Sequence, residues 1–172
     1  MKTIETRRHT YRSKPGQHLS QQGVTLARHV GEGMGPFARV VTSTIPRAFE
    51  TAIAMGFAVD EQVELMSSYG DDVELEVPWP QSPAVYASVM ENWGAAARYA
   101  NQLADFYRRL ANDLSDGSAA LVISHGGTVE MGVVACLPGA DHTSWGPHFE
   151  CCEGARLFWE NGNFVKAEIL RV

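Results

Sequence analysis

The sequence is organised around short apolar runs that are each followed by a helical pattern, and this alternation limits the folds open to the chain. The run 37–43 (FARVVTS) leads into a helical pattern over 47–55, and 118–124 (SAALVIS) leads into one over 128–137. A weaker run at 2–7 (KTIETR) precedes a pattern over 20–31. Strands that alternate with helices typically form a mostly parallel sheet packed between two layers of helices.

The helix boundaries carry recognisable signals. Ser20 is predicted to cap the first helix and Gly31 to end it. Thr44 is the expected cap of the second helix, which has Pro46 in its first turn and ends at Gly56.

Two later segments complete the expected architecture. Residues 84–114 predict helix with a break near Gly94, and 156–172 predict a β-hairpin whose tight turn is Asn161-Gly162. The fold class is therefore α/β: a three-layer α/β/α sandwich with a mostly parallel sheet and an antiparallel edge strand. The proline-rich segment 67–83 predicts a long surface loop, the candidate lid of the site.

Composition narrows the class of protein further. A length of 172 residues with 45% apolar and 20% charged residues fits one globular domain spanning 1–172, with an insertion around 67–83. The net charge of −6 argues against nucleic-acid and anionic-membrane partners. No apolar run suits a membrane helix or a secretory signal, and three cysteines form no disulfide framework. We expect a cytoplasmic protein; nothing indicates its oligomeric state.

A cluster of basic residues stands out against this acidic background. The stretch 5–14 (ETRRHTYRSK) contains four cationic side chains and one imidazole. Arg8 and His9 end the first expected strand, Arg47 lies in the helical turn after the second, and His125 ends the run 118–124. Because the carboxyl ends of parallel strands meet at one rim of a sheet, these residues are expected to converge. Guanidinium groups and a helix N-terminus there suit a phosphoryl group.

Histidine adds chemistry that phosphate binding alone does not need. An imidazole is largely neutral at pH 7, so one ring nitrogen can attack phosphorus while the other holds the proton. Positive charge from Arg8, Arg47 and a protonated His125 would stabilise the transition state, and this scheme requires no metal or other cofactor.

Four motifs in order resemble the histidine phosphatase superfamily, also called phosphoglycerate mutase-like. They are RRHT, LSQQG, VVTSTIPRAFETA and VISHGGT, spread over about residues 3–134. The resemblance implies a phosphoglycerate mutase-like fold, with His9 as the phosphorylated nucleophile. It also implies Arg8 and Arg47 as phosphate clamps and His125 as the second imidazole of the pocket.

Some positions depart from the family pattern or extend it. Thr10 stands where the family usually has glycine, and its side chain is expected to narrow the loop and to offer a hydroxyl donor. Arg12 matches an arginine of the acid-phosphatase branches, so we assign it to substrate binding. Gly126 is expected to let the backbone pass close to the phosphate.

The acidic residue that many members use has no clean counterpart. Ser67 falls near its position, as in the short bacterial phosphohistidine phosphatases, which this segment resembles. Four carboxylates are within reach, and the sequence does not choose among them: Glu64, Asp71, Asp72 and Glu74. Without an acid to protonate the leaving group, such an enzyme would favour good leaving groups, among them phosphoramidates and phosphoanhydrides.

The sequence thus predicts a metal-independent phosphohydrolase that acts through a phosphohistidine on His9, with a phosphorylated small molecule or phosphoprotein as substrate. Two alternatives stay open. A phosphoglycerate mutase-type phosphotransferase is disfavoured because it must exclude water, which needs more enclosing structure than this short chain offers. A catalytically inactive phosphate-binding module is suggested by Thr10 and the missing acid.

Overall fold

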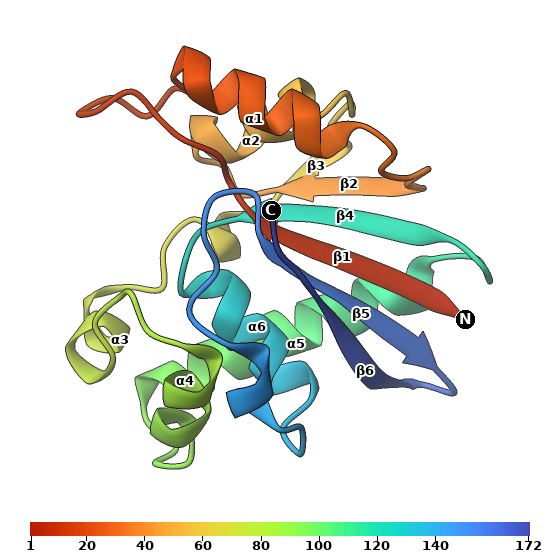
Figure 1. Ribbon diagram of the computed structural model, residues 1–172. Helices are drawn as coiled ribbons and strands as arrows, with labels where there is room; N and C mark the ends of the chain where they lie inside the picture. The colour runs from red at the N-terminus through yellow and green to blue at the C-terminus, as the bar shows by residue number, and fades with distance from the viewer.

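One six-stranded sheet lies at the centre of the molecule in the computed structural model, which describes residues 1–172 (Figure 1). The strand order is β3-β2-β4-β1-β5-β6. Pairs β3–β2, β2–β4 and β4–β1 are parallel, whereas β1–β5 and β5–β6 are antiparallel. The strands are β1 (Lys2–Arg8), β2 (Arg39–Thr42), β3 (Glu61–Gln62), β4 (Ala119–Ser124), β5 (Gly154–Glu160) and β6 (Asn163–Leu170).

Helices cover both faces of this sheet. In Figure 1, α1 and α2 lie on one face and α3 to α6 on the other, which confirms the predicted three-layer α/β architecture. The helices are α1 (Gln21–Gly31), α2 (Pro46–Ala54), α3 (Asp71–Glu76), α4 (Pro83–Met90), α5 (Ala95–Asp113) and α6 (Thr128–Cys136). Two short 3-10 turns lie at Glu64–Met66 and His142–Trp145. No helix is both long enough and apolar enough to cross a membrane.

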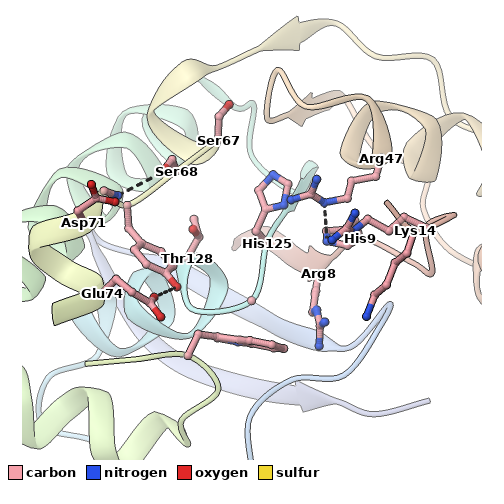
Figure 2. A pocket seen from close by; sticks show the side chains of 15 residues that line it. Arg8, His9, Lys14, Arg47, Ser67, Ser68, Asp71, Glu74, His125 and Thr128 are labelled. Atoms are coloured by element: carbon pink, nitrogen blue, oxygen red, sulfur yellow. Dashed lines mark hydrogen bonds between the residues drawn. The ribbon is translucent and has the colours of Figure 1, made fainter. Parts of the chain in front are cut away.

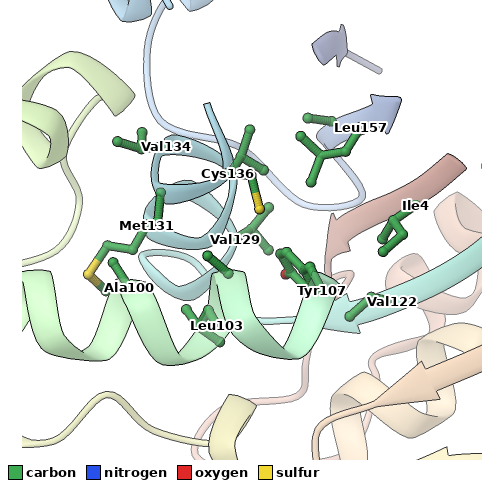
Figure 3. Packing of buried hydrophobic residues seen from close by; sticks show 14 of the residues in the cluster. Ile4, Ala100, Leu103, Tyr107, Val122, Val129, Met131, Val134, Cys136 and Leu157 are labelled. Carbon is green, nitrogen blue, oxygen red and sulfur yellow. The ribbon is translucent and has the colours of Figure 1, made fainter. Parts of the chain in front are cut away.

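The larger hydrophobic core lies between the sheet and α5 and α6. Leu103 and Tyr107 of α5 pack with Val129 and Met131 of α6 in one cluster of 30 buried residues (Figure 3). A smaller cluster of eight buried residues lies under α1 and α2 on the opposite face. The central strand β4 contributes to both clusters, which fixes the position of its carboxyl end.

Most predicted helix ends are confirmed, and one is wrong. The Ser20 hydroxyl accepts a hydrogen bond from the backbone N–H of Gly23 at 3.1 Å and caps α1, which ends at Gly31. Pro46 opens α2 as expected. Thr44 does not cap that helix: Ile45 holds the N-cap position without a side-chain hydrogen bond. The Thr44 hydroxyl instead donates to Glu64 at 2.5 Å, because the segment after β3 packs against it.

The segment 67–83 is more ordered than the sequence predicted. It contains the short helix α3, whereas we expected a long surface loop that could not be regular throughout. The break near Gly94 is confirmed, since α4 and α5 are separate helices. The hairpin turn is also confirmed: Asn161 and Gly162 have φ values of 52° and 83°, the left-handed geometry that a two-residue turn requires.

Candidate active site

The carboxyl ends of β1 and β4 and the start of α2 border one cavity of about 490 Å³ (Figure 2). Arg8 ends β1 and His9 follows it, His125 follows β4, and Arg47 lies in the first turn of α2. Fifteen residues line the cavity: Arg8, His9, Arg12, Lys14, Arg47, Ser67, Ser68, Tyr69, Gly70, Asp71, Glu74, Trp79, His125, Gly126 and Thr128. All six residues that the sequence assigned to the site are among them.

The hydrogen bonds of His9 define which of its ring nitrogens carries the proton. Nδ1 lies 2.6 Å from the carbonyl oxygen of Thr10, so Nδ1 carries the proton and Nε2 keeps its lone pair. The Arg47 Nε–H donates to this Nε2 at 3.0 Å. Burial lowers the pKa of His9 to about 3; the bond to Thr10 opposes this shift, and the nearby guanidinium groups reinforce it. His9 is therefore neutral at pH 7.

Thr10 anchors the loop that carries His9. Its backbone N–H donates to the Thr51 hydroxyl at 3.1 Å, and its own hydroxyl donates to the carbonyl oxygen of Gly23 at 3.0 Å. The side chain is fully buried and does not line the cavity. The hydroxyl that we expected as a possible donor in the site is thus used to tie the loop to α1.

His125 lies edge-on to His9, with ring centroids 5.1 Å apart and planes inclined by 61°. Its Nε2 lies 2.7 Å from the Ser43 hydroxyl oxygen. That hydroxyl also accepts a hydrogen bond from the backbone N–H of Ile45 at 3.3 Å. The other ring nitrogen of His125, Nδ1, is buried and has no hydrogen-bond partner.

His125 is neutral in the ligand-free site. Burial lowers its pKa to about 2, and His9, Arg47 and Arg8 add to the effect. The protonated form expected from the sequence belongs to the transition state, where the charge of a phosphoryl group opposes the desolvation and the nearby cations.

Arg8 is held by the loop before β5. Its Nη1 donates to the carbonyl oxygen of Phe149 at 2.9 Å, and its guanidinium carbon lies 4.7 Å from the ring centroid of Trp79. Glu130 supports this loop from below: its buried carboxylate accepts from the backbone N–H groups of Phe149 at 2.8 Å and Gly127 at 2.7 Å. Burial raises the Glu130 pKa to about 7, against the effect of these hydrogen bonds. Glu130 thus links the turn after His125 to the loop that holds Arg8.

Three further cations border the same end of the cavity. Besides its bond to His9, Arg47 donates through Nη1 to the Gln17 side-chain oxygen. Arg12 donates to the carbonyl oxygens of Pro15 at 3.3 Å and Gly16 at 2.8 Å, which orders the loop between His9 and α1. Lys14 lies in this loop, and the sequence analysis did not assign it to the site.

Two of the four candidate acids line the cavity and two do not. Asp71 and Glu74 of α3 form the wall opposite the cations (Figure 2), whereas Glu64 and Asp72 lie outside the lining. The Tyr69 hydroxyl donates to the Glu74 carboxylate at 2.6 Å. Ser67 lines the cavity and lies 2.8 Å from the Thr44 hydroxyl.

The remaining wall includes Trp79 and Ser68, which belong to the segment 67–83 expected as the lid, and Thr128, which we did not assign to the site. Trp79 packs directly on Gly126: a Cβ at position 126 would lie 2.4 Å from the indole Nε1. Gly126 therefore leaves room for the indole, a role that we did not expect from the sequence. Thr128 and Ser68 also line the cavity. In the sequence, Pro78, Pro80 and Pro83 had indicated a surface loop around Trp79.

The comparison with protein families gives a match that agrees with this geometry. The model of the histidine phosphatase superfamily, branch 1, matches residues 2–169. The chain belongs to the histidine phosphatase superfamily. The match spans nearly the whole chain, so the matched residues include the central sheet and the turns that carry His9 and His125. No curated protein matches the chain.

Solved structures of other superfamily proteins share the fold at low sequence identity. A phosphoserine phosphatase from Entamoeba histolytica, in complex with 3-phosphoglyceric acid, is 15% identical with a TM-score of 0.66 and covers 100% of this chain and 98% of its own. A phosphoglycerate mutase from Bacillus anthracis is 14% identical with a TM-score of 0.68, covering 99% and 92%. A mycobacterial glucosyl-3-phosphoglycerate phosphatase is 17% identical with a TM-score of 0.66, covering 98% and 97%.

Proposed function

We propose that this member of the histidine phosphatase superfamily is a metal-independent phosphohydrolase that forms a phosphohistidine on His9. The observation that carries the proposal is the hydrogen bond between His9 Nδ1 and the Thr10 carbonyl oxygen. It fixes the tautomer in which Nε2 carries the lone pair, which accepts from Arg47 in the free protein, and the low pKa keeps that lone pair unprotonated at neutral pH.

The reaction proceeds in two displacements. In the first, His9 Nε2 attacks phosphorus, the bond from phosphorus to the ester oxygen breaks, and the leaving alkoxide takes a proton from solvent water. In the second, water attacks the phosphohistidine and loses a proton to the solvent, the electrons of the P–N bond return to Nε2, and inorganic phosphate leaves. The Arg47 Nε–H, which donates to Nε2 in the free protein, turns to the phosphoryl oxygens once Nε2 is bonded to phosphorus. Arg8 and Arg12 supply further positive charge there.

His125 acts as the second imidazole. A phosphate dianion bound beside the two rings reverses the electrostatic balance that keeps His125 neutral, so phosphate binding is coupled to proton uptake.

Ser67 stands where many members have an acid, and this substitution affects which leaving groups the site can release. Asp71 and Glu74 are the acids that line the cavity, on the wall opposite His9. A leaving group that needs little protonation is therefore cleaved fastest, which favours phosphoramidates, phosphoanhydrides and aryl esters over simple alkyl phosphates.

The test combines hydrolysis with trapping of the intermediate. Wild type should release phosphate from p-nitrophenyl phosphate in EDTA, and denaturing quench should capture an acid-labile phosphoryl group on His9. His9→Asn should lose at least about 10³-fold in kcat, as expected for removal of a nucleophile. His29→Asn is the matched control, because His29 is an exposed residue of α1 remote from the cavity. A phosphoenzyme that persists in His9→Asn would refute the assignment.

The same experiment separates the two alternatives. A mutase is favoured by the fold it shares with the Bacillus anthracis phosphoglycerate mutase, and it would exchange phosphoglycerate isomers while releasing little phosphate. An inactive phosphate-binding module would bind inorganic phosphate equally well in wild type and His9→Asn and hydrolyse nothing.

A further inference from the structure

The Arg8 guanidinium has one hydrogen bond that fixes its orientation. Its Nη1 donates to the carbonyl oxygen of Phe149 at 2.9 Å, whereas its Nε is buried and has no partner. The exposed Glu150 carboxylate lies 3.6 Å from Nη1, beyond hydrogen-bond distance, and the Trp79 ring contacts the guanidinium through its face. The direction in which this guanidinium points therefore depends on the Phe149 carbonyl group.

A buried carboxylate holds the Phe149 peptide in turn. Glu130 of α6 is fully buried, and its Oε1 accepts from the backbone N–H of Phe149 at 2.8 Å. Its Oε2 accepts from the backbone N–H of Gly127, two residues after His125, at 2.7 Å. One side chain thus bonds both to the loop that orients Arg8 and to the turn that carries His125.

Both bonds are strongest when Glu130 is ionised. A carboxylate accepts through both oxygens, whereas a protonated carboxyl group has a hydroxyl that donates, so one of the two N–H groups then loses its charged acceptor. Burial raises the pKa of this carboxyl group to about 7, although the two N–H groups and the Arg8 charge oppose the shift. The link therefore changes strength within the neutral pH range.

The charged and titratable groups around Glu130 keep one form in this range. The tyrosines have pKa values raised by burial well above their ordinary value of about 10, and a guanidinium stays charged. His9 and His125 are neutral. The groups that act on the carboxylate are Arg8 of β1, Tyr69 before α3, Tyr86 of α4 and Tyr107 of α5.

We propose that Glu130 is a positioning residue: its carboxylate, acting through the Phe149 peptide, holds the Arg8 guanidinium in the orientation that stabilises the phosphoryl group during transfer. This inference rests on the proposed function and adds a proton-dependent control of the same site. Protonation of Glu130 loosens the link, so kcat falls as pH falls through neutrality. A purely electrostatic role predicts the opposite, because a buried anion near Arg8 repels a phosphate dianion and its protonation would lower KM.

Glu130→Gln separates the two roles. The amide keeps the shape and one acceptor oxygen, but it lacks the charge and the second acceptor. At about pH 8.5, kcat for p-nitrophenyl phosphate should fall at least about tenfold, while KM changes by less than about threefold. Wild-type kcat should decline on the acid side of about pH 7 and approach that of the variant, which should lack this decline. A lower KM with unchanged kcat in the variant would overturn the inference.

The controls alter a surface pair in the same loop. Nε2 of His148 lies 3.1 Å from the Glu150 carboxylate, and both groups are near enough to Arg8 to give a pH dependence of their own. His148→Asn and Glu150→Gln should each keep the acid decline of kcat. If it disappears in either control and persists in Glu130→Gln, Glu130 does not control Arg8.

Heteronuclear NMR of the ligand-free protein follows the link without catalysis. The backbone amides of Gly127 and Phe149 and the Nε–H of Arg8 should titrate with one midpoint near pH 7. This titration should be lost in Glu130→Gln; if that variant does not fold, Glu130→Asp should move the midpoint, and an unmoved midpoint would refute the link. Wild type that cleaves no p-nitrophenyl phosphate would sink the proposed function. An Arg8 resonance that stays fixed while both amides titrate would overturn the inference alone.

Discussion

The imidazoles of His9 and His125 are only 8% exposed and lie beside guanidinium groups, an environment that favours their neutral forms. Neutrality suits a nucleophile, but it also makes the folded state sensitive to acid. In the unfolded chain both side chains titrate near pH 6.5, whereas the folded pKa values are about 3 and about 2. Between these limits the unfolded chain binds protons that the folded protein excludes, so stability falls as pH falls.

Each histidine should therefore lower the free energy of unfolding by about 2 kcal/mol between pH 8 and pH 5. His9→Asn should remove about half of the combined loss, measured by urea unfolding at both pH values, whereas His29→Asn should leave it unchanged. Glu130 acts in the opposite sense, because its raised pKa removes stability as pH rises from its unfolded value towards about 7. Because Glu130 is present in both proteins, the difference in stability between variant and wild type does not contain its contribution. An equal acid loss in His9→Asn and wild type would contradict the prediction.

The contact between Gly126 and Trp79 gives a second prediction at this scale. Gly126→Ala would place Cβ 2.4 Å from the indole Nε1 and 2.7 Å from Cε2, so the ring must shift and its contact with the Arg8 guanidinium must change. We expect a loss of about 1–3 kcal/mol in stability, with a changed tryptophan emission spectrum and a lower kcat/KM for p-nitrophenyl phosphate. Gly139→Ala is the control, since its Cβ would meet no atom within 4 Å. Equal behaviour of the two variants would refute this contact.

Among the elements, β1 combines a central position with a polar sequence. It pairs with β4 on one side and β5 on the other, yet Glu5 and Arg7 are buried. The Glu5 carboxylate accepts from Arg7 Nε at 2.6 Å and from Arg156 Nη2 of β5 at 2.8 Å. The pair with Arg7 lies within β1 and the pair with Arg156 crosses to β5. Together they satisfy charges that would otherwise exclude the segment from a sheet interior.

Neutralising Glu5 should therefore destabilise the sheet strongly. Glu5→Gln leaves Arg7 and Arg156 without their buried counter-charge, and we expect a loss of about 3–5 kcal/mol in the free energy of unfolding. Glu168→Gln removes the exposed partner of Arg156 and should cost less than about 1 kcal/mol. Urea unfolding of both variants at pH 7 measures the difference, and a similar small loss in each would show that the buried pairs do not stabilise β1.

These examples explain which elements the sequence could predict. The run 118–124 could be predicted clearly as a strand because β4 is apolar and buried. The run 2–7 was only a weak strand prediction, because the burial of its charged Glu5 depends on Arg156, which lies far away in the chain. Helix α3 has six residues, too few for a helical period to be visible before the prolines that follow. Strand β3 has two residues and no pattern at all.

The same distinction applies to the candidate site: some of its residues could be predicted from the sequence, and others could not. Residues at strand ends, such as His9 and His125, were predictable because sheet topology brings the carboxyl ends of parallel strands to one edge. The opposite wall comes from α3 and the segment containing Trp79, whose positions depend on tertiary packing. Lys14 belonged to a visible basic cluster, but only the course of the loop after His9 brings it to the cavity.

At the scale of the whole molecule, charge is distributed unevenly. The chain has 20 acidic and 14 basic residues, yet four of the basic side chains border one end of a single cavity. A substrate dianion is repelled by the molecule as a whole and attracted near its binding site. Since salt screens exposed charges, with a Debye length of about 10 Å at 0.1 M, both effects fade as ionic strength rises.

Lys14 offers a way to measure the local attraction. It is exposed and makes no hydrogen bond or ion pair, so Lys14→Ala removes charge at the cavity with little effect on the fold. We expect kcat/KM for p-nitrophenyl phosphate to fall about threefold at low salt, and the difference from wild type to disappear near about 0.5 M NaCl, where screening is nearly complete. Lys166→Ala, which removes an exposed charge from β6, should follow wild type at every salt concentration. If Lys14→Ala and Lys166→Ala lose activity equally, the substrate responds to net charge alone, and the local cluster has no separate role in capturing the phosphate.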